Sequence, residues 1–175
     1  MKQLLRTAEI SLQLDTYDDI FSDFDPRPFS QRALSDDFLL EAQRALRDRE
    51  GNSVQLRFLM PRDLRNPPEE ALIKRRLRDH FHRHYLKELE GMRRLKREGL
   101  LMAIGGICMI LLATWIATFA ENTFLLHLLI ILLEPGGWFT AWTGLDQLYY
   151  TARERQPSLA FYERMHQAEI LFEGY

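Results

Sequence analysis

The sequence has very little cysteine and no excess of basic charge. Cys108 is the single cysteine among 175 residues, which excludes an intramolecular disulfide and a metal cluster built from cysteines. Lys and Arg total 23 against 25 Asp and Glu, a net charge of -2, so the chain as a whole lacks the positive field that attracts nucleic acid. Residues 1–10 lack the apolar core and cleavage site of a secretory signal, so we expect no N-terminal processing.

Long apolar runs, by contrast, dominate the second half of the chain. Residues 99–119 contain no charged side chain, and a helix of this length can cross a hydrocarbon core of roughly 30 Å. A second apolar run covers residues 124–148 and follows a polar turn at residues 120–123. Because so short a link joins only antiparallel neighbours, the sequence predicts a two-helix transmembrane hairpin.

Basic side chains flank the first span on one side only. Four of them lie just before it: Arg93, Arg94, Lys96 and Arg97. The turn at residues 120–123 has neither Lys nor Arg, so the positive-inside rule makes it extracytoplasmic. We therefore expect residues 1–98 and 149–175 to be cytoplasmic, and the four basic side chains to contact anionic lipid head groups.

Small residues recur at helical spacing in both spans. One set shares a face of the first span: Gly106, Ala113 and Ala117. The other set shares a face of the second span: Gly137, Ala141 and Gly144. Such faces let helix backbones approach closely in lipid. They predict packing within the hairpin, packing between the subunits of a homo-oligomer, or both.

The second span also contains two polar side chains that are costly to place in lipid. His127 and Glu134 are seven residues apart and share a helical face. One hypothesis is a proton or cation relay that uses this pair. The other, which the sequence favours, is a helix break at residues 134–137, where the carboxylate of Glu134 would bind backbone amides exposed by the break.

The N-terminal part predicts a small domain of strands and helices. Alternating apolar and polar residues predict strands at 10–14 and 54–60. A helix at residues 36–46, capped by Ser35, lies between them and makes a β-α-β unit, whose right-handed crossover makes the strands parallel. A long helix is expected over residues 68–98.

The segment after the second span is expected to return to this domain. Pro157 is predicted to open a short helix that ends at His166, and residues 168–172 predict a third strand. The predicted fold class is therefore an α+β membrane protein, with a cytoplasmic β-α-β-α domain and a transmembrane hairpin.

Two sequence motifs carry a resemblance. Residues 24–30 read Phe-Asp-Pro-Arg-Pro-Phe-Ser, and residues 137–142 read Gly-Trp-Phe-Thr-Ala-Trp. Together with the order of helix, strand, charged helix and two spans, they resemble a family of uncharacterised bacterial two-span membrane proteins with a Gly-Trp-x-x-x-Trp signature. Thr143-Gly144 stands where that family usually has Arg-Pro. The resemblance covers nearly the whole chain and implies a multi-pass protein of a bacterial inner membrane, without implying an activity.

The first motif also raises a question of chemistry. Its residues are Asp23, Asp25, Pro26, Arg27 and Pro28. The aspartate pair is similar to the paired aspartates of phosphotransferases and sugar transferases, but the Pro-Arg-Pro that follows departs from the phosphotransferase pattern. The turn preferences of Asp and Pro favour a rigid turn, with Asp25 and Arg27 bonded to the backbone or to each other.

Two histidines have the spacing of a metal site. His80 and His84 lie four residues apart on one helical face, where two imidazoles can share a zinc ion. No further ligand pattern accompanies them, so we expect no metal and no cofactor. We expect the histidines instead to hydrogen-bond to the acidic segment that follows the first strand.

Taken together, these patterns favour a non-enzymatic membrane scaffold or adaptor. The expected partners are the lipid bilayer, other copies in a homo-oligomer and an unidentified protein, with no nucleic acid. Two alternatives stay open. One is a small channel or transporter subunit that uses His127 and Glu134; the other is a membrane-tethered enzyme with a site at Asp23 and Asp25. No residue is assigned a catalytic role.

Overall fold

The computed structural model describes residues 7–47, 53–119 and 123–175. The chain divides into two compact units, which we describe separately. Unit 1 comprises Met1–Lys87 and Ser158–Tyr175, and unit 2 comprises Glu88–Pro157. Of the predicted turn at residues 120–123, only Thr123 lies within the described residues.

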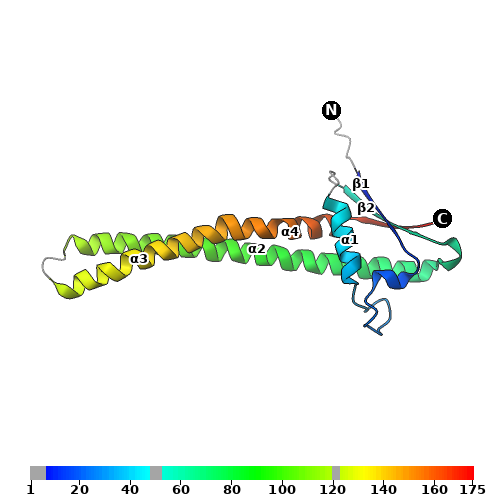
Figure 1. The fold of residues 1–175 in the computed structure, drawn as a ribbon, viewed down its shortest axis with the longest axis horizontal. Coiled ribbons are helices and arrows are strands. Elements are labelled where there is room, and N and C mark those ends of the chain that lie inside the picture. Colours follow the sequence, from blue (N-terminus) through cyan, green and yellow to red (C-terminus); the bar gives the residue numbers. More distant parts are fainter. Residues whose placement is uncertain (1–6, 48–52, 120–122) are drawn as a thin grey trace, which may run out of the picture. The chain divides into compact units, whose positions relative to one another are not determined.

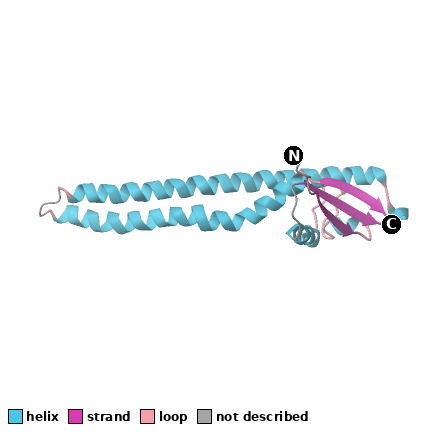
Figure 2. Ribbon diagram, turned by 90° about the horizontal axis from the view of Figure 1, so that it is seen from above, coloured by secondary structure: helices cyan, strands magenta, loops and turns pink. Residues whose placement is uncertain are grey.

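Unit 1 is built on a three-stranded parallel sheet (Figure 2). Its strands are β1 (Thr7–Gln13), β2 (Ser53–Met60) and β3 (Glu169–Gly174), in the order β1-β2-β3. Leu56 of β2 pairs with Ile10 of β1 and with Ile170 of β3. The prediction of parallel strands, with a third strand supplied by the end of the chain, is confirmed.

The core of unit 1 lies on one face of this sheet. Alternate residues of β2 are buried, as the period of two in a strand requires. They contact α1 (Asp36–Arg47), the first part of α2 (Pro67–Ala117) and the last part of α4 (Ala152–His166). α1 buries Phe38, Ala42 and Leu46, the apolar residues of the predicted helix.

The other face of the sheet is polar. Arg57, on the central strand, forms ion pairs with Glu9 at 3.2 Å and with Glu173 at 3.7 Å. The strand order explains this difference between the faces. When consecutive parallel strands are neighbours, crossovers of the same hand place their helices on the same side of the sheet. The topology therefore covers one face and leaves the other to polar side chains.

Two short 3-10 helices follow the first two strands. η1 (Tyr17–Ile20) follows β1, and η2 (Arg62–Leu64) follows β2. The Tyr17 hydroxyl donates to Glu70 at 3.2 Å and accepts from the backbone N–H of Asn66 at 2.8 Å. Arg65 holds the buried Glu70 with two further bonds, at 2.8 and 3.0 Å, and lowers the pKa of its carboxyl. These contacts fasten η1 to the start of α2.

The regular elements of unit 2 are all helices among its described residues, 88–119 and 123–157. It contains the later part of α2, then α3 (Phe124–Asp146), the π-helical turn η3 (Gln147–Thr151) and the start of α4 (Figure 1). Two helical stretches are long and apolar enough to cross a membrane, by length and composition alone. Only 17% and 11% of their most apolar windows are buried, so most of this apolar surface faces outward.

Two expectations based on proline are wrong. α3 continues through Pro135, so no helix break occurs at residues 134–137. α4 begins at Ala152 and contains Pro157 in its interior, so this proline does not open the helix. A proline removes one N–H from the helical ladder, and such a loss is tolerated where the neighbouring turns are held by other contacts.

Phe58 tests the packing of unit 1. It lies on β2 with no exposed surface and packs against Phe172, with ring centroids 5.0 Å apart. We expect Phe58→Ala to lower the free energy of unfolding of unit 1 by about 3–5 kcal/mol, because it leaves a cavity. Hydrogen exchange at the β2 amides of the full chain measures this loss. Leu59→Ala, on the polar face, is the matched control and should change β2 exchange much less.

Candidate functional site

Residues 22–33, which contain the first motif, form a loop closed at its base. Phe21 and Leu34 form an isolated antiparallel bridge, and the Ser22 N–H donates to the Ala33 carbonyl at 2.9 Å. Phe29 stacks on Phe21, with ring centroids 5.1 Å apart. The loop is therefore anchored both through its backbone and through an aromatic contact to the core.

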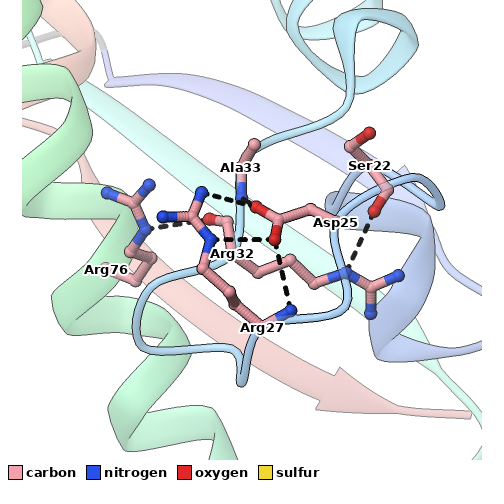
Figure 3. Close-up of polar contacts among 6 residues, drawn as sticks. All are labelled: Ser22, Asp25, Arg27, Arg32, Ala33 and Arg76. Atoms are coloured by element: carbon pink, nitrogen blue, oxygen red, sulfur yellow. Dashed lines mark hydrogen bonds and ion pairs between the residues drawn. The ribbon is translucent and has the colours of Figure 1, made fainter.

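The carboxylate of Asp25 is the centre of this loop (Figure 3). It accepts two bonds from the Arg27 guanidinium, at 2.8 and 2.7 Å, and one from the Arg27 backbone N–H at 3.2 Å. The Ala33 N–H adds a fourth, at 2.7 Å, from the far side of the loop. The Arg27 guanidinium, followed by the Ala33 amide, holds the pKa of the Asp25 carboxyl far below its usual range.

Asp23 and Asp25 have different partners. The side chain of Asp23 is 89% exposed, and its one described partner is Arg32 at 4.0 Å. The lone pairs of Asp25 are occupied by hydrogen bonds from its own loop. This arrangement makes Asp25 a group that organises the turn, because a carboxylate so fully bonded has little remaining capacity to act as a base or to ligate a metal.

Arginines tie the same loop to its surroundings. Arg32 donates to the Ser22 carbonyl at 3.0 Å and forms an ion pair with Asp18 of η1. Arg76 of α2 donates to the Arg32 carbonyl at 3.0 Å (Figure 3). Neither arginine was predicted from the sequence, because each acts on a partner 10 to 44 residues away, and no local pattern marks such pairs. Phe24, at the tip, is 98% exposed.

The rings of two histidines of α2 stack on each other. The rings of His80 and His84 lie 4.2 Å apart, and His84 stacks on Tyr162 of α4 at 5.2 Å. The Nε2 of His80 is buried without a hydrogen-bond partner among the described residues, so the expected bond to the acidic segment is wrong for His80. Burial, followed by the charge of His84, lowers the pKa of His80 to about 4. No group of three metal-ligating side chains occurs among the described residues.

In unit 2, α2 and α3 touch through glycine. A Cβ built on Gly106 would collide with the backbone N of Ala141 and the carbonyl oxygen of Gly137. A Cβ built on Gly144 would collide in the same way with the backbones of Ala103 and Gly99. The two helix backbones are therefore in direct contact, which is the geometry that small residues permit. Figure 1 shows the two helices side by side.

The predicted small residues differ in their positions. Five of the six are buried: Gly106, Ala113, Gly137, Ala141 and Gly144. Ala117, near the end of α2, is exposed. Gly99 and Ala103 also lie in the contact and were not predicted, although their spacing to Gly106 continues the same pattern of four and three residues.

The polar residues of α3 lie outside this contact. His127 and Glu134 are both exposed, and Nδ1 of His127 lies 3.1 Å from the Thr123 carbonyl oxygen. The bond to Thr123 closes a local turn at the start of α3. The structure therefore places both side chains on the outer surface of the helix pair.

The basic residues before the first apolar run are exposed as well. They are Arg93, Arg94, Lys96 and Arg97. The three arginines of this set, together with Glu90 and Glu98, line a shallow open hollow of about 370 Å³ on the surface of α2. Arg94 also forms an ion pair with Glu98 at 2.7 Å, one helical turn away. Basic and acidic side chains therefore lie together on this part of the α2 surface.

Comparison with family models, with curated proteins and with solved structures gives no match to this chain. The resemblance in the two motifs stays a prediction. The proposed function therefore rests on three features of the structure: the helix pair, the basic cluster and the loop of residues 22–33.

Asp25→Asn should loosen the loop. The substitution removes the ion pair with Arg27 and weakens the bond from the Ala33 N–H. We expect faster hydrogen exchange at the Ala33 amide of the full chain. Asp23→Asn, at an exposed carboxylate, is the matched control and should leave this exchange unchanged.

The lowered pKa of the Asp25 carboxyl predicts that the stability of the loop depends on pH. Folding lowers the pKa of Asp25, so its stabilising effect is complete above the unfolded pKa of about 4 and is lost as the pH falls below that value. Protection of the Ala33 amide, corrected for intrinsic exchange, should therefore hold near neutral pH and fall in stronger acid. Equal protection at all acid pH values would contradict this assignment.

Adjacent glycines test the helix contact. Gly106→Ala should destabilise the hairpin by about 1–3 kcal/mol, because the new methyl group has no space. A Cβ at Gly105 meets nothing within 4 Å, so Gly105→Ala should be neutral or stabilising by up to about 1 kcal/mol. The three tryptophans all lie between residues 115 and 142, so tryptophan fluorescence during unfolding in detergent reports on this contact. Equal effects of the two substitutions would contradict it.

Proposed function

We propose that this chain is a non-enzymatic integral membrane scaffold or adaptor that assembles as a homo-oligomer. The observation that carries the proposal is the helix pair of unit 2, whose backbones meet at glycine while most of its apolar surface faces outward. An apolar surface of this extent is unfavourable in water and favourable in lipid. The hairpin is thus an anchor whose two helices are fixed to each other.

The basic cluster supports an orientation for this anchor. Arg93, Arg94, Lys96 and Arg97 are exposed just before the apolar part of α2, where anionic lipid head groups of the cytoplasmic leaflet attract cations. We therefore place residues 1–98 and 149–175 in the cytoplasm of a bacterial cell and the turn at 120–123 outside its inner membrane. The bacterial assignment rests on the resemblance in the two motifs.

Unit 1 has the properties of a module that presents a surface. Its core lies on one face of the sheet. The loop of residues 22–33, which we call the motif loop, is held by bonds of Asp25, Arg27 and Arg32, while the ring of Phe24 is exposed. A rigid loop loses little conformational entropy when a partner binds it. The saturated Asp25 carboxylate favours this role over acid–base catalysis. We do not extend the proposal to a channel, because His127 and Glu134 lie on the outer surface of the helix pair.

Cysteine labelling tests the membrane assignment. In a Cys108→Ala background, we introduce Phe24→Cys at the loop tip or Thr123→Cys at the start of α3, both exposed positions. A membrane-impermeant maleimide should label Thr123→Cys in intact spheroplasts and Phe24→Cys only after permeabilisation. Both variants should resist extraction with alkaline carbonate.

Three results would contradict the proposal. They are extraction of the chain by carbonate, labelling of Phe24→Cys from outside, and a monomeric mass by native mass spectrometry in nanodiscs. A monomeric mass would contradict the homo-oligomeric scaffold. Extraction by carbonate or labelling of Phe24→Cys from outside would contradict the membrane assignment.

A further inference from the structure

Arg76 of α2 lies where positive charge is not fully compensated. Three other arginines, each bonded to a carboxylate, have raised pKa values: Arg27, Arg65 and Arg94. The pKa of Arg76 is instead lowered, by burial and then by the charges of Arg83 and Arg27. Asp79 and Asp25 act in the opposite direction, but each has a smaller effect than either arginine. The half-buried guanidinium of Arg76 therefore lacks a counter-ion of its own.

The guanidinium groups of Arg27, Arg76 and Arg83, which we call the arginine cluster, are each held by part of their nitrogen atoms. Nε of Arg76 donates to a backbone carbonyl of the motif loop at 3.0 Å, and Nε of Arg83 donates to the Asp79 carbonyl at 3.1 Å. Arg27 uses Nε and Nη2 to bind Asp25. In the part of the chain that the structure describes, the other Nη atoms of the three arginines have no hydrogen-bond or ion-pair partner.

Two segments that are distant in sequence bring the cluster together. Arg76 and Arg83 are seven residues apart, so they lie on one face of α2. The bond of Arg83 to the Asp79 carbonyl turns its guanidinium toward the N-terminal end of the helix, and so toward Arg76. The motif loop supplies Arg27, and Figure 3 shows its guanidinium near that of Arg76, beside Asp25. The cluster is contained in unit 1.

The two nearby carboxylates do not use the open Nη atoms. The Asp25 carboxylate is filled by bonds from Arg27 and from the Ala33 N–H. Asp79 is exposed and forms no ion pair with another described residue. Two guanidinium groups of α2 therefore present donors, beside a third from the loop, without an acceptor from the described chain.

The chemistry of the cluster favours an oxyanion with several oxygens. Guanidinium groups bind carboxylate and phosphate through paired N–H donors. A carboxylate has two oxygens and one charge, whereas a phosphate monoester has three strong acceptor oxygens and a charge near -2 at neutral pH. A phosphate monoester can thus accept bonds from all three arginines at once, and a single carboxylate cannot do so as well.

We propose that Arg27, Arg76 and Arg83 form a binding site for a phosphate monoester on unit 1, in which their open Nη groups donate to the phosphate oxygens. Soluble phosphorylated metabolites and the head group of phosphatidic acid share this chemistry. The site goes beyond the proposed function, and it rests neither on the membrane location nor on the homo-oligomer.

Calorimetric titration of the full chain with glycerol 3-phosphate, in phosphatidylcholine nanodiscs at physiological salt, tests the site. We expect saturable binding that Arg83→Gln weakens about tenfold, because bonds between charged groups are lost. Arg83 is exposed and its described bond lies within α2, so this variant should keep the fold. Arg75→Gln removes the same charge from an exposed position of α2 and should leave the affinity nearly unchanged. No saturable binding, or equal weakening by the two substitutions, would overturn the site.

Arg76→Lys tests the guanidinium group apart from its charge. Lysine keeps the positive charge but lacks the planar pair of Nη donors, so we expect affinity for glycerol 3-phosphate to fall several-fold. Arg75→Lys is the matched control and should bind like the unchanged chain. Hydrogen exchange at the Ala33 amide shows whether the motif loop keeps its structure in Arg76→Lys. Unchanged affinity in this variant would overturn the assignment of Arg76.

Lipid composition separates the two sources of the phosphate. If the head group of phosphatidic acid occupies the site, nanodiscs that contain this lipid should bind glycerol 3-phosphate several-fold more weakly than nanodiscs with phosphatidylglycerol, an anionic phosphodiester. Equal affinity in the two nanodiscs assigns the site to a soluble phosphate monoester. Both results support the site. Extraction by carbonate or a monomeric mass would contradict the proposed function and leave this site standing.

Discussion

The structure of unit 2 depends on backbone contact between α2 and α3 at Gly106, Gly137 and Gly144. In the membrane that we propose for this chain, lipid would give little hydrophobic drive for two apolar helices to associate, so their attraction would come from close packing. With no side chain between the backbones, each helix presents nearly all its large residues outward. The same contact keeps the outer surface of α3 in one fixed orientation relative to α2. The positions of Glu134, Trp138 and Trp142 on that surface follow from it.

Unit 1 is governed by a different constraint, which is the order of its strands. In open sheets with parallel strands, ligands usually bind where the strand order reverses and the crossovers diverge to opposite faces. The order β1-β2-β3 has no such reversal. The loops after the strands are instead joined by the buried contacts among Tyr17, Arg65 and Glu70. These contacts lie at the edge where other parallel sheets hold a ligand.

Much of unit 1 could be predicted from local sequence patterns. Alternation identified the strands around Ile10 and Leu56, and the handedness of crossovers made them parallel. The pairing of Ile170 was predictable for the same reason, because a short alternating segment can bury its apolar face only against an existing sheet. The apolar spacing in α1 was equally informative.

The failures have a common physical origin. Pro135 and Pro157 are breakers in isolation, but whether a helix ends depends on the contacts of the turns around them. The stacking of His80 depends on α4, which is distant in sequence. The bond from Arg76 of α2 to the Arg32 carbonyl also joins the loop of residues 22–33 to a distant segment. In each case the deciding partner is set by the tertiary fold, and a single sequence gives no local sign of it.

The pairing of β2 with β3 gives the chain a built-in order of assembly. β2 ends at Met60, whereas its partner on this side begins at Glu169, after both apolar helices. Until the ribosome has made those helices, one side of β2 has no strand to pair with and exposes unsatisfied backbone groups. A chain arrested before the end of the second helix therefore carries an open sheet edge, which favours aggregation and proteolysis. Completion of the three-stranded sheet thus requires that the whole helix pair has been synthesised.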